Sequence, residues 1–256
     1  MPQALLDGTP ESRIAAMAAL VARAAPPSRV ELEALRDCLA DQRKPVQRRA
    51  AETFAALSAR GVQVEYLLRN VLTVRDLRAR WGAAYALSLL QRLQFEALPT
   101  LFEVVALDDG DLRWAASELI KQLAAVDRER VVAALLVAAR DPGPQRKMAL
   151  YCLRDLGVAE SSDIALAALT DPHLETRLAA VALLAKVHRD PSSAARRIAA
   201  LVDDADPRMQ RVAAATLGNL GISLPEVLAA LDRAEASSDD SLRRAAARSR
   251  ALLERS

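Results

Sequence analysis

The sequence predicts an all-α protein, an α-solenoid of about eight helical hairpins, and three observations support this. Arginines recur along all 256 residues at nearly fixed spacing, and most are followed after one further residue by two small residues. Hydrophobic residues, mainly the helix formers Ala and Leu, make up 52% of the chain. No segment alternates polar and apolar residues as a half-buried strand would. A period of about 33 residues that covers the whole chain indicates stacked repeats rather than one central core.

The arginines define a register, and subtracting successive positions gives gaps of 31 to 35 residues. They are Arg13, Arg48, Arg80, Arg113, Arg146, Arg177, Arg211 and Arg243. The register predicts one repeat domain over residues 1–256. Its repeats are expected near residues 1–24, 31–61, 63–92, 95–125, 129–157, 160–188, 192–221 and 223–254.

Each repeat reads as an A helix followed by a B helix, and residues 192–221 show why. Asp206 can cap the free amides at the start of the B helix, Pro207 suits its first turn, and Gly221 can end it. Aspartate pairs at the same turn are interpreted as caps rather than acid–base pairs. The predicted A helices lie near 31–40, 63–73, 95–107, 129–140, 160–170, 192–203 and 223–235. The B helices lie near 11–24, 45–59, 77–92, 111–125, 144–156, 174–187, 208–220 and 240–254, and the first lacks a full partner.

The repeated pattern resembles the HEAT repeat, in the short form of phycobilisome-lyase-type proteins. It is clearest from Asp206-Pro207 through Arg211 and Ala213-Ala214 to Gly221, while repeat three has Arg75-Asp76 in place of Asp-Pro. The resemblance implies a right-handed superhelix with the B helices lining its concave face. It also implies that each register arginine pairs with a turn aspartate of the neighbouring repeat, which makes these arginines structural.

Composition and motifs argue against several other classes of protein. The net charge of +2 lacks the large excess of a non-specific nucleic-acid binder. Cys38 and Cys152 stand apart in apolar runs and are expected to be buried. No secretory signal or membrane-spanning run is present, so we expect a cytoplasmic protein. His173 and His188 have no carboxylate at metal-ligand spacing, and we predict no metal, no cofactor and no catalytic residue.

Helical geometry predicts which B-helix residues are buried and which face outward. At 100° per residue, positions 3, 6, 7 and 10 after the register arginine share one face, which should form the core. In repeat four these are Ala116, Leu119, Ile120 and Leu123. Positions 1, 5 and 8 lie opposite and should be exposed. In repeats two to five that column comprises Arg49, Thr53, Ala56, Trp81, Tyr85, Ser88, Trp114, Glu118, Lys121, Lys147, Tyr151 and Arg154.

The column concentrates aromatic and basic residues, as binding surfaces do. It holds four of the eight aromatic residues of the chain, and Trp and Tyr are frequent binding hot spots. We therefore predict a non-catalytic scaffold that binds a protein partner, with an acidic segment, on its concave face. The predicted contact residues are Arg49, Trp81, Tyr85, Trp114, Glu118, Lys121, Lys147, Tyr151 and Arg154.

Alternatives remain open at this stage. The two indoles can equally pack between repeats rather than bind a partner. Trp114, Glu118 and Arg154 also fit, by residue type, a nucleic-acid-binding protein related to HEAT-like DNA glycosylases. A bilin lyase or chaperone-like accessory protein follows from the resemblance alone.

Overall fold

A computed structural model describes residues 2–255, and within that range every regular element is a helix. The chain divides into two compact units, Met1–Val131 and Val132–Ser256, with the boundary inside α9 (Arg128–Arg140). The units are described separately below. That residues 1–256 form a single domain, and that the superhelix is right-handed, stay predictions.

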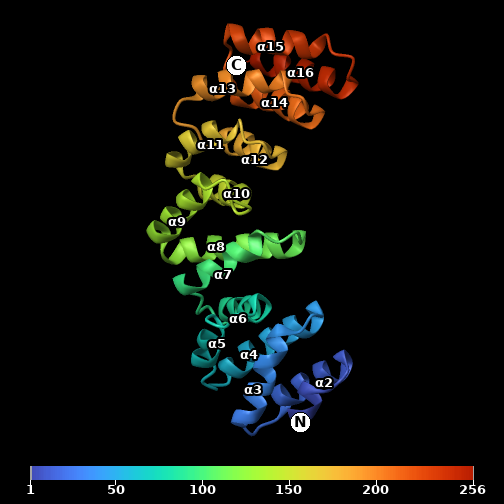
Figure 1. Ribbon diagram of the computed structural model, residues 1–256, viewed down its shortest axis with the longest axis vertical. Helices are drawn as coiled ribbons and strands as arrows, with labels where there is room; N and C mark the ends of the chain where they lie inside the picture. Colours follow the sequence, from blue (N-terminus) through green and yellow to red (C-terminus); the bar gives the residue numbers. More distant parts are fainter. Residues whose placement is uncertain (1, 256) are drawn as a thin grey trace. The chain divides into compact units, whose positions relative to one another are not determined.

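The first unit alternates A and B helices as predicted (Figure 1). The B helices are α2, α4, α6 and α8, and η marks a short 3₁₀ helix. The elements are α1 (Pro2–Leu6), α2 (Pro10–Ala22), α3 (Arg29–Asp37), η1 (Cys38–Ala40), α4 (Lys44–Ala59), α5 (Glu65–Val71), α6 (Leu77–Leu89), η2 (Phe95–Ala97), α7 (Leu98–Val105) and α8 (Gly110–Val126). Helix α1 was not predicted. It packs against the first B helix, α2, and serves as its short partner, and its Leu5 is fully buried.

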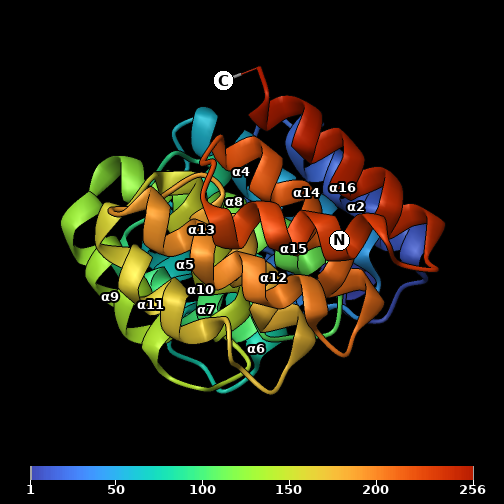
Figure 2. The same cartoon turned by 90° about the horizontal axis from the view of Figure 1, so that it is seen from above.

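The second unit repeats this alternation. After α9 its elements are α10 (Arg146–Leu156), η3 (Ala159–Ser161), α11 (Ser162–Ala168), α12 (Leu174–Leu184), α13 (Pro191–Ala199), η4 (Ala200–Asp203), α14 (Pro207–Leu220), α15 (Pro225–Glu235) and α16 (Asp240–Leu253). Helices α14 and α16 lie side by side (Figure 2). Their close approach requires Gly218, where a Cβ atom would lie 2.6 Å from the Cα of Ser249.

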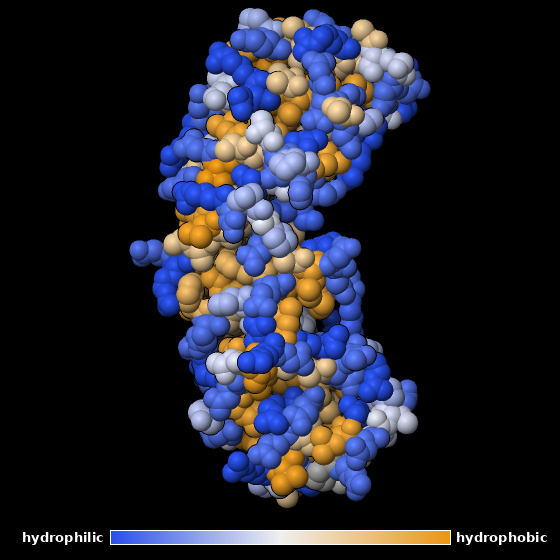
Figure 3. Space-filling model, viewed as in Figure 1, coloured by the Kyte–Doolittle hydropathy of each residue, from blue (hydrophilic) through white to orange (hydrophobic). Residues whose placement is uncertain are grey.

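The predicted core positions are confirmed in repeat four, since Ala116, Leu119, Ile120 and Leu123 are all buried. Hydrophobic residues show between hydrophilic side chains on the face drawn in Figure 3. Cys38 and Cys152 are buried, as predicted. Burial raises the pKa of the Cys38 thiol to about 11.

The turn chemistry is confirmed for repeat seven and corrected elsewhere. Asp206 accepts a hydrogen bond from the Arg208 amide at 2.8 Å, Pro207 begins α14, and Gly221 ends it with φ of 68°. Asp109 and Asp239 also cap helices. Other turn aspartates are not N-caps but partners in ion pairs. These are Asp108, Asp171, Asp203, Asp204 and Asp240.

Candidate functional site

Helix α6 of the first unit packs closely against η1 at a glycine. At Gly82, where most repeats have alanine, a Cβ atom would lie 2.5 Å from the carbonyl oxygen of Leu39 in η1. Helix α6 therefore lies closer to η1 than an alanine would allow. The buried Gln47 of α4 fixes this arrangement, since its amide donates to the carbonyls of Leu39 at 2.6 Å and Arg78 at 3.0 Å.

The prediction that Trp81 is exposed is wrong. Its side chain lies on α6 and is only 7% exposed. The ring stacks on that of Tyr85, itself half-buried, with centroids 6.0 Å apart and planes inclined by 29°. Thr53, from the same predicted column, is also buried, and its hydroxyl donates to the Arg49 carbonyl at 2.7 Å. In a stack each B helix is covered on its flanks as well as by the core, so the exposed stripe is narrower than an isolated helix suggests.

Trp114 behaves differently and is 68% exposed, as predicted. It lies on α8, and both indoles line one cavity of about 460 Å³ between α4, α6 and α8. We call this cavity the indole groove. Its lining residues are Lys44, Pro45, Gln47, Arg48, Trp81, Gly82, Tyr85, Asp111, Leu112, Trp114 and Ala115.

A salt bridge spans one side of the indole groove. The Lys44 ammonium, at the start of α4, lies 3.0 Å from the Asp109 carboxylate and 3.3 Å from that of Asp111, at the start of α8. The hydrogen bond to Asp109 raises the pKa of Lys44. The pKa of Asp109 is lowered, first by the Leu112 amide that this carboxylate caps and then by Lys44. Two charges of the groove lining are thus neutralised within the protein.

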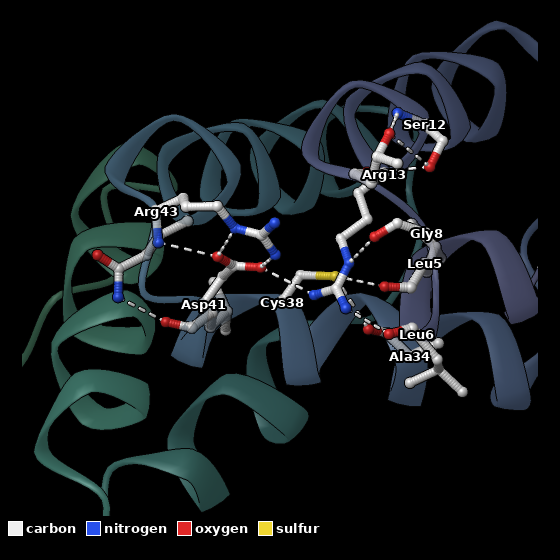
Figure 4. Close-up of polar contacts among 12 residues, drawn as sticks. Leu5, Leu6, Gly8, Ser12, Arg13, Ala34, Cys38, Asp41 and Arg43 are labelled. Carbon is white, nitrogen blue, oxygen red and sulfur yellow. Dashed lines mark hydrogen bonds and ion pairs between the residues drawn. The ribbon is translucent and has the colours of Figure 1, made fainter.

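Four register arginines form ion pairs with a turn aspartate of the neighbouring repeat, as the sequence resemblance implied for all eight. The Arg13 guanidinium lies 2.8 Å from the Asp41 carboxylate, which Arg43 contacts from the other side (Figure 4). The hydrogen bond from Arg43 is the main reason that the pKa of Asp41 is lowered. Equivalent pairs are Arg146–Asp171 at 2.7 Å, Arg177–Asp204 at 3.0 Å and Arg211–Asp239 at 3.0 Å. Arg80 pairs with Glu103 instead, and Arg113 and Arg243 pair with Asp108 and Asp240 of their own turns.

Arg48 departs from this pattern. Its side chain is exposed, lines the indole groove, and donates no hydrogen bond to, and forms no ion pair with, residues 2–255. Asp76 stands 28 residues ahead (76 minus 48), the separation found for Arg13–Asp41 and Arg211–Asp239. However, the Asp76 carboxylate accepts from the Arg78 amide at 2.9 Å and lines a different cavity. Arg48 was predicted to be structural like the other register arginines, and its availability for binding was not predicted. The signal in the sequence is the altered turn of repeat three, Arg75-Asp76 in place of Asp-Pro.

The other predicted contact residues of the first unit lie outside the groove lining. Arg49 is exposed and pairs with Glu52 at 3.5 Å. Glu118 and Lys121 are half-buried and pair with each other at 2.5 Å. The expected basic ribbon is therefore weaker than a count of arginines and lysines suggests, because nearby carboxylates neutralise it.

The remaining predicted residues, Lys147, Tyr151 and Arg154, belong to the second unit and are half-buried. The Arg154 guanidinium lies 5.0 Å from the centre of the Tyr151 ring and 2.7 Å from the Asp155 carboxylate. Burial raises the pKa of Tyr151. Their contact with a partner stays a prediction.

A larger cavity, of about 960 Å³, lies on the A-helix side of the first unit between α3 and α5. Its exposed aromatic residue is Tyr66, at 78% exposure. Four of its charged residues are paired with each other, Arg29 with Glu33 at 2.8 Å and Arg36 with Asp37 at 2.7 Å. The indole groove is the stronger candidate, since it combines two indoles with an unpaired guanidinium.

The groove is suited to binding rather than to chemistry. Its residues offer two indoles, a phenol ring and one available cation, which together can hold an apolar side chain and an anion. No three His, Cys, Asp or Glu residues among those described are grouped so that they could hold a metal ion. No helix in the described part of the chain is long and apolar enough to cross a membrane.

Comparisons with known proteins agree with this architecture. The family model of HEAT repeats matches residues 162–251. The sequence match to HEAT repeats thus covers the C-terminal part of the chain. No curated protein matches its sequence.

Solved structures share its fold at low sequence identity. An engineered protein of known crystal structure is 19% identical, with a TM-score of 0.51, over 98% of this chain and 77% of that one. The karyopherin Kap121p, bound to the extreme C-terminus of the protein phosphatase Cdc14p, is 16% identical with a TM-score of 0.63. Importin beta is 13% identical with a TM-score of 0.61. The chain aligns over 98% and 99% of its length with these two proteins but spans only 33% and 40% of theirs.

Proposed function

We propose that this protein is a non-catalytic scaffold that binds a segment of a partner protein in the indole groove. The observation that carries the proposal is that the exposed Trp114, the buried Trp81 and the half-buried Tyr85 line one cavity. Aromatic anchors in a partly enclosed cavity are the usual centre of a binding surface. Kap121p, which has a similar fold, is bound to a protein C-terminus, and this supports a peptide segment as the occupant.

The division of labour between the indoles follows from their burial. Trp81 forms the floor of the groove with Tyr85, and its role is to shape the cavity. Trp114 has most of its ring available, and burying an aromatic ring removes about 150–250 Å² from water. Trp114 is therefore the residue whose loss should weaken binding without weakening the fold.

The test is selection of peptides from a random displayed library on the folded full-length protein. Peptides enriched on the wild type should lose about 2 kcal/mol or more of binding free energy, roughly 30-fold in affinity, on Trp114→Ala. The matched control is Tyr66→Ala, which removes an equally exposed ring outside the groove. Equal affinities of wild type and Trp114→Ala for every enriched peptide, or enrichment of none, would refute the proposal.

A further inference from the structure

We infer that Arg48 binds a carboxylate of the partner segment, so that the partner supplies the acid that this arginine lacks within the protein. The inference rests on the proposed function and names the chemistry of its ligand. At the other seven register positions a carboxylate of the protein itself contacts the guanidinium. The exception coincides with the indole groove.

The orientation of the two potential partners explains why they do not meet. Arg48 lines the indole groove on the B-helix side, whereas Asp76 lines the cavity between α3 and α5. Asp76 is also committed as the cap of α6, through the Arg78 amide. The guanidinium is thus directed to the groove.

Arg48 is the charge that remains uncompensated in the groove among the residues described. Three charged residues line the groove, and the other two, Lys44 and Asp111, pair with one another at 3.3 Å. A partner that covers Trp114 would also remove Arg48 from water, and a buried guanidinium without an acceptor is strongly unfavourable. A carboxylate matches the planar fork of arginine with two parallel hydrogen bonds.

The charge distribution favours a peptide carboxylate over the phosphates of a nucleic acid. Binding to a phosphate backbone depends on several cations acting together. The neighbouring cations in the sequence, Lys44 and Arg49, already contact carboxylates of the protein. A single available guanidinium beside an apolar floor fits one acidic group next to one apolar side chain. That acidic group is either an Asp or Glu side chain or the C-terminal carboxylate of the segment.

The experiment is a double-mutant cycle with a synthetic peptide taken from the library selection. Replacing its Asp or Glu by Asn or Gln, and separately amidating its C-terminus, identifies the source of the carboxylate. One of these changes should weaken binding to the wild type about ten- to a hundredfold, the range expected for a charge-assisted hydrogen bond. The same change should have less than about a twofold effect on Arg48→Gln.

Two controls separate the possible outcomes. Arg49→Gln alters the neighbouring exposed arginine and should keep the full preference for the acidic peptide. Arg48→Gln should unfold at the same temperature as the wild type, because Arg48 has no ion pair to lose. A peptide that depends on Trp114 but binds Arg48→Gln as tightly as the wild type would overturn this inference and leave the proposed function standing. Failure to enrich any peptide would overturn both. If a single-stranded DNA oligonucleotide displaces the peptide, and this displacement requires Arg48, the ligand of Arg48 is a phosphate and the inference of a peptide carboxylate is wrong.

Discussion

Arg146 and Arg48 occupy the same register position in two units of one protein, yet their surroundings differ. Arg146 is largely buried and lies 2.7 Å from the Asp171 carboxylate, which is almost inaccessible to water. Arg48 is exposed and unpaired within the part of the chain that the structure describes. The residue type and its spacing are therefore not enough to assign a role. The role depends on whether the next turn presents its carboxylate to the arginine or to its own helix.

The two turns differ in how far their aspartate stands from the helix that follows. Asp171 precedes α12 by three residues, so its carboxylate can contact the His173 amide at 2.8 Å as well as Arg146. Asp76 directly precedes α6 and is used as its cap. Proximity to the helix is not decisive by itself, because Asp239 caps α16 and still pairs with Arg211. The close approach of α6 to η1 at Gly82 is the further difference in repeat three.

Removing the turn aspartate should expose this difference most clearly. Asp171→Ala should lower the free energy of unfolding by about 3–5 kcal/mol, because it leaves the guanidinium of Arg146 buried without its partner. Asp76→Ala should cost only about 1 kcal/mol, the usual value of a helix N-cap. Chemical denaturation of both variants measures the two values. Similar losses for the two variants would mean that Asp76 also stabilises Arg48, and that Arg48 is not unpaired.

The helices and most of their boundaries could be predicted because the signals are local. Asp206-Pro207 and Gly221 begin and end α14 through their own backbone preferences, and the apolar face of α8 follows from helical geometry. Helix α1 was missed because five residues are too few for a periodic pattern, and it packs against both α2 of its own repeat and α3 of the next.

The site was predicted in part. The wrong predictions concern properties that depend on tertiary contacts. Trp114 was correctly placed on an exposed face of α8, although Glu118 and Lys121 of the same predicted column are half-buried. The burial of Trp81 depends on the distance between α6 and η1, and the effect of Gly82 is decided by Leu39, more than forty residues earlier. The pairing of a register arginine is likewise a tertiary property. Asp76 has the same sequence separation from Arg48 as Asp41 has from Arg13, so spacing alone could not distinguish them.

Adding a methyl group at Gly82 should disturb the packing of α6 against η1, with a smaller loss of stability than Asp171→Ala. In Gly82→Ala the added methyl group would overlap the Leu39 carbonyl, so α6 must shift away from η1. We expect a loss of roughly 1–3 kcal/mol in the free energy of unfolding, as for other overpacked sites. Gly110→Ala is the matched control, because a Cβ there has no neighbour within 4 Å. That change at the start of α8 should instead stabilise the protein by about 0.4–1 kcal/mol. Unchanged stability in Gly82→Ala would show that the close approach to η1 does not hold α6 in place.

Lowering the pH should reduce the stability contributed by paired arginines but not by Arg48, and this effect is expected to be the smallest. Arg23 pairs with Glu31 at 2.8 Å, and this hydrogen bond is the main reason that the pKa of Glu31 falls from 4.5 to about 2. Because the folded pKa lies below the unfolded one, the stabilisation is complete above about pH 4.5 and is lost as the pH falls toward 2. Arg23 is about one-third exposed, so solvent screening reduces the contribution. Denaturation curves across this range should show a shallower loss of stability in Glu31→Gln than in the wild type. Arg48→Gln should follow the wild-type curve throughout, because it removes no partner from any carboxylate, and a shallower curve for that variant would reveal an ion pair at Arg48.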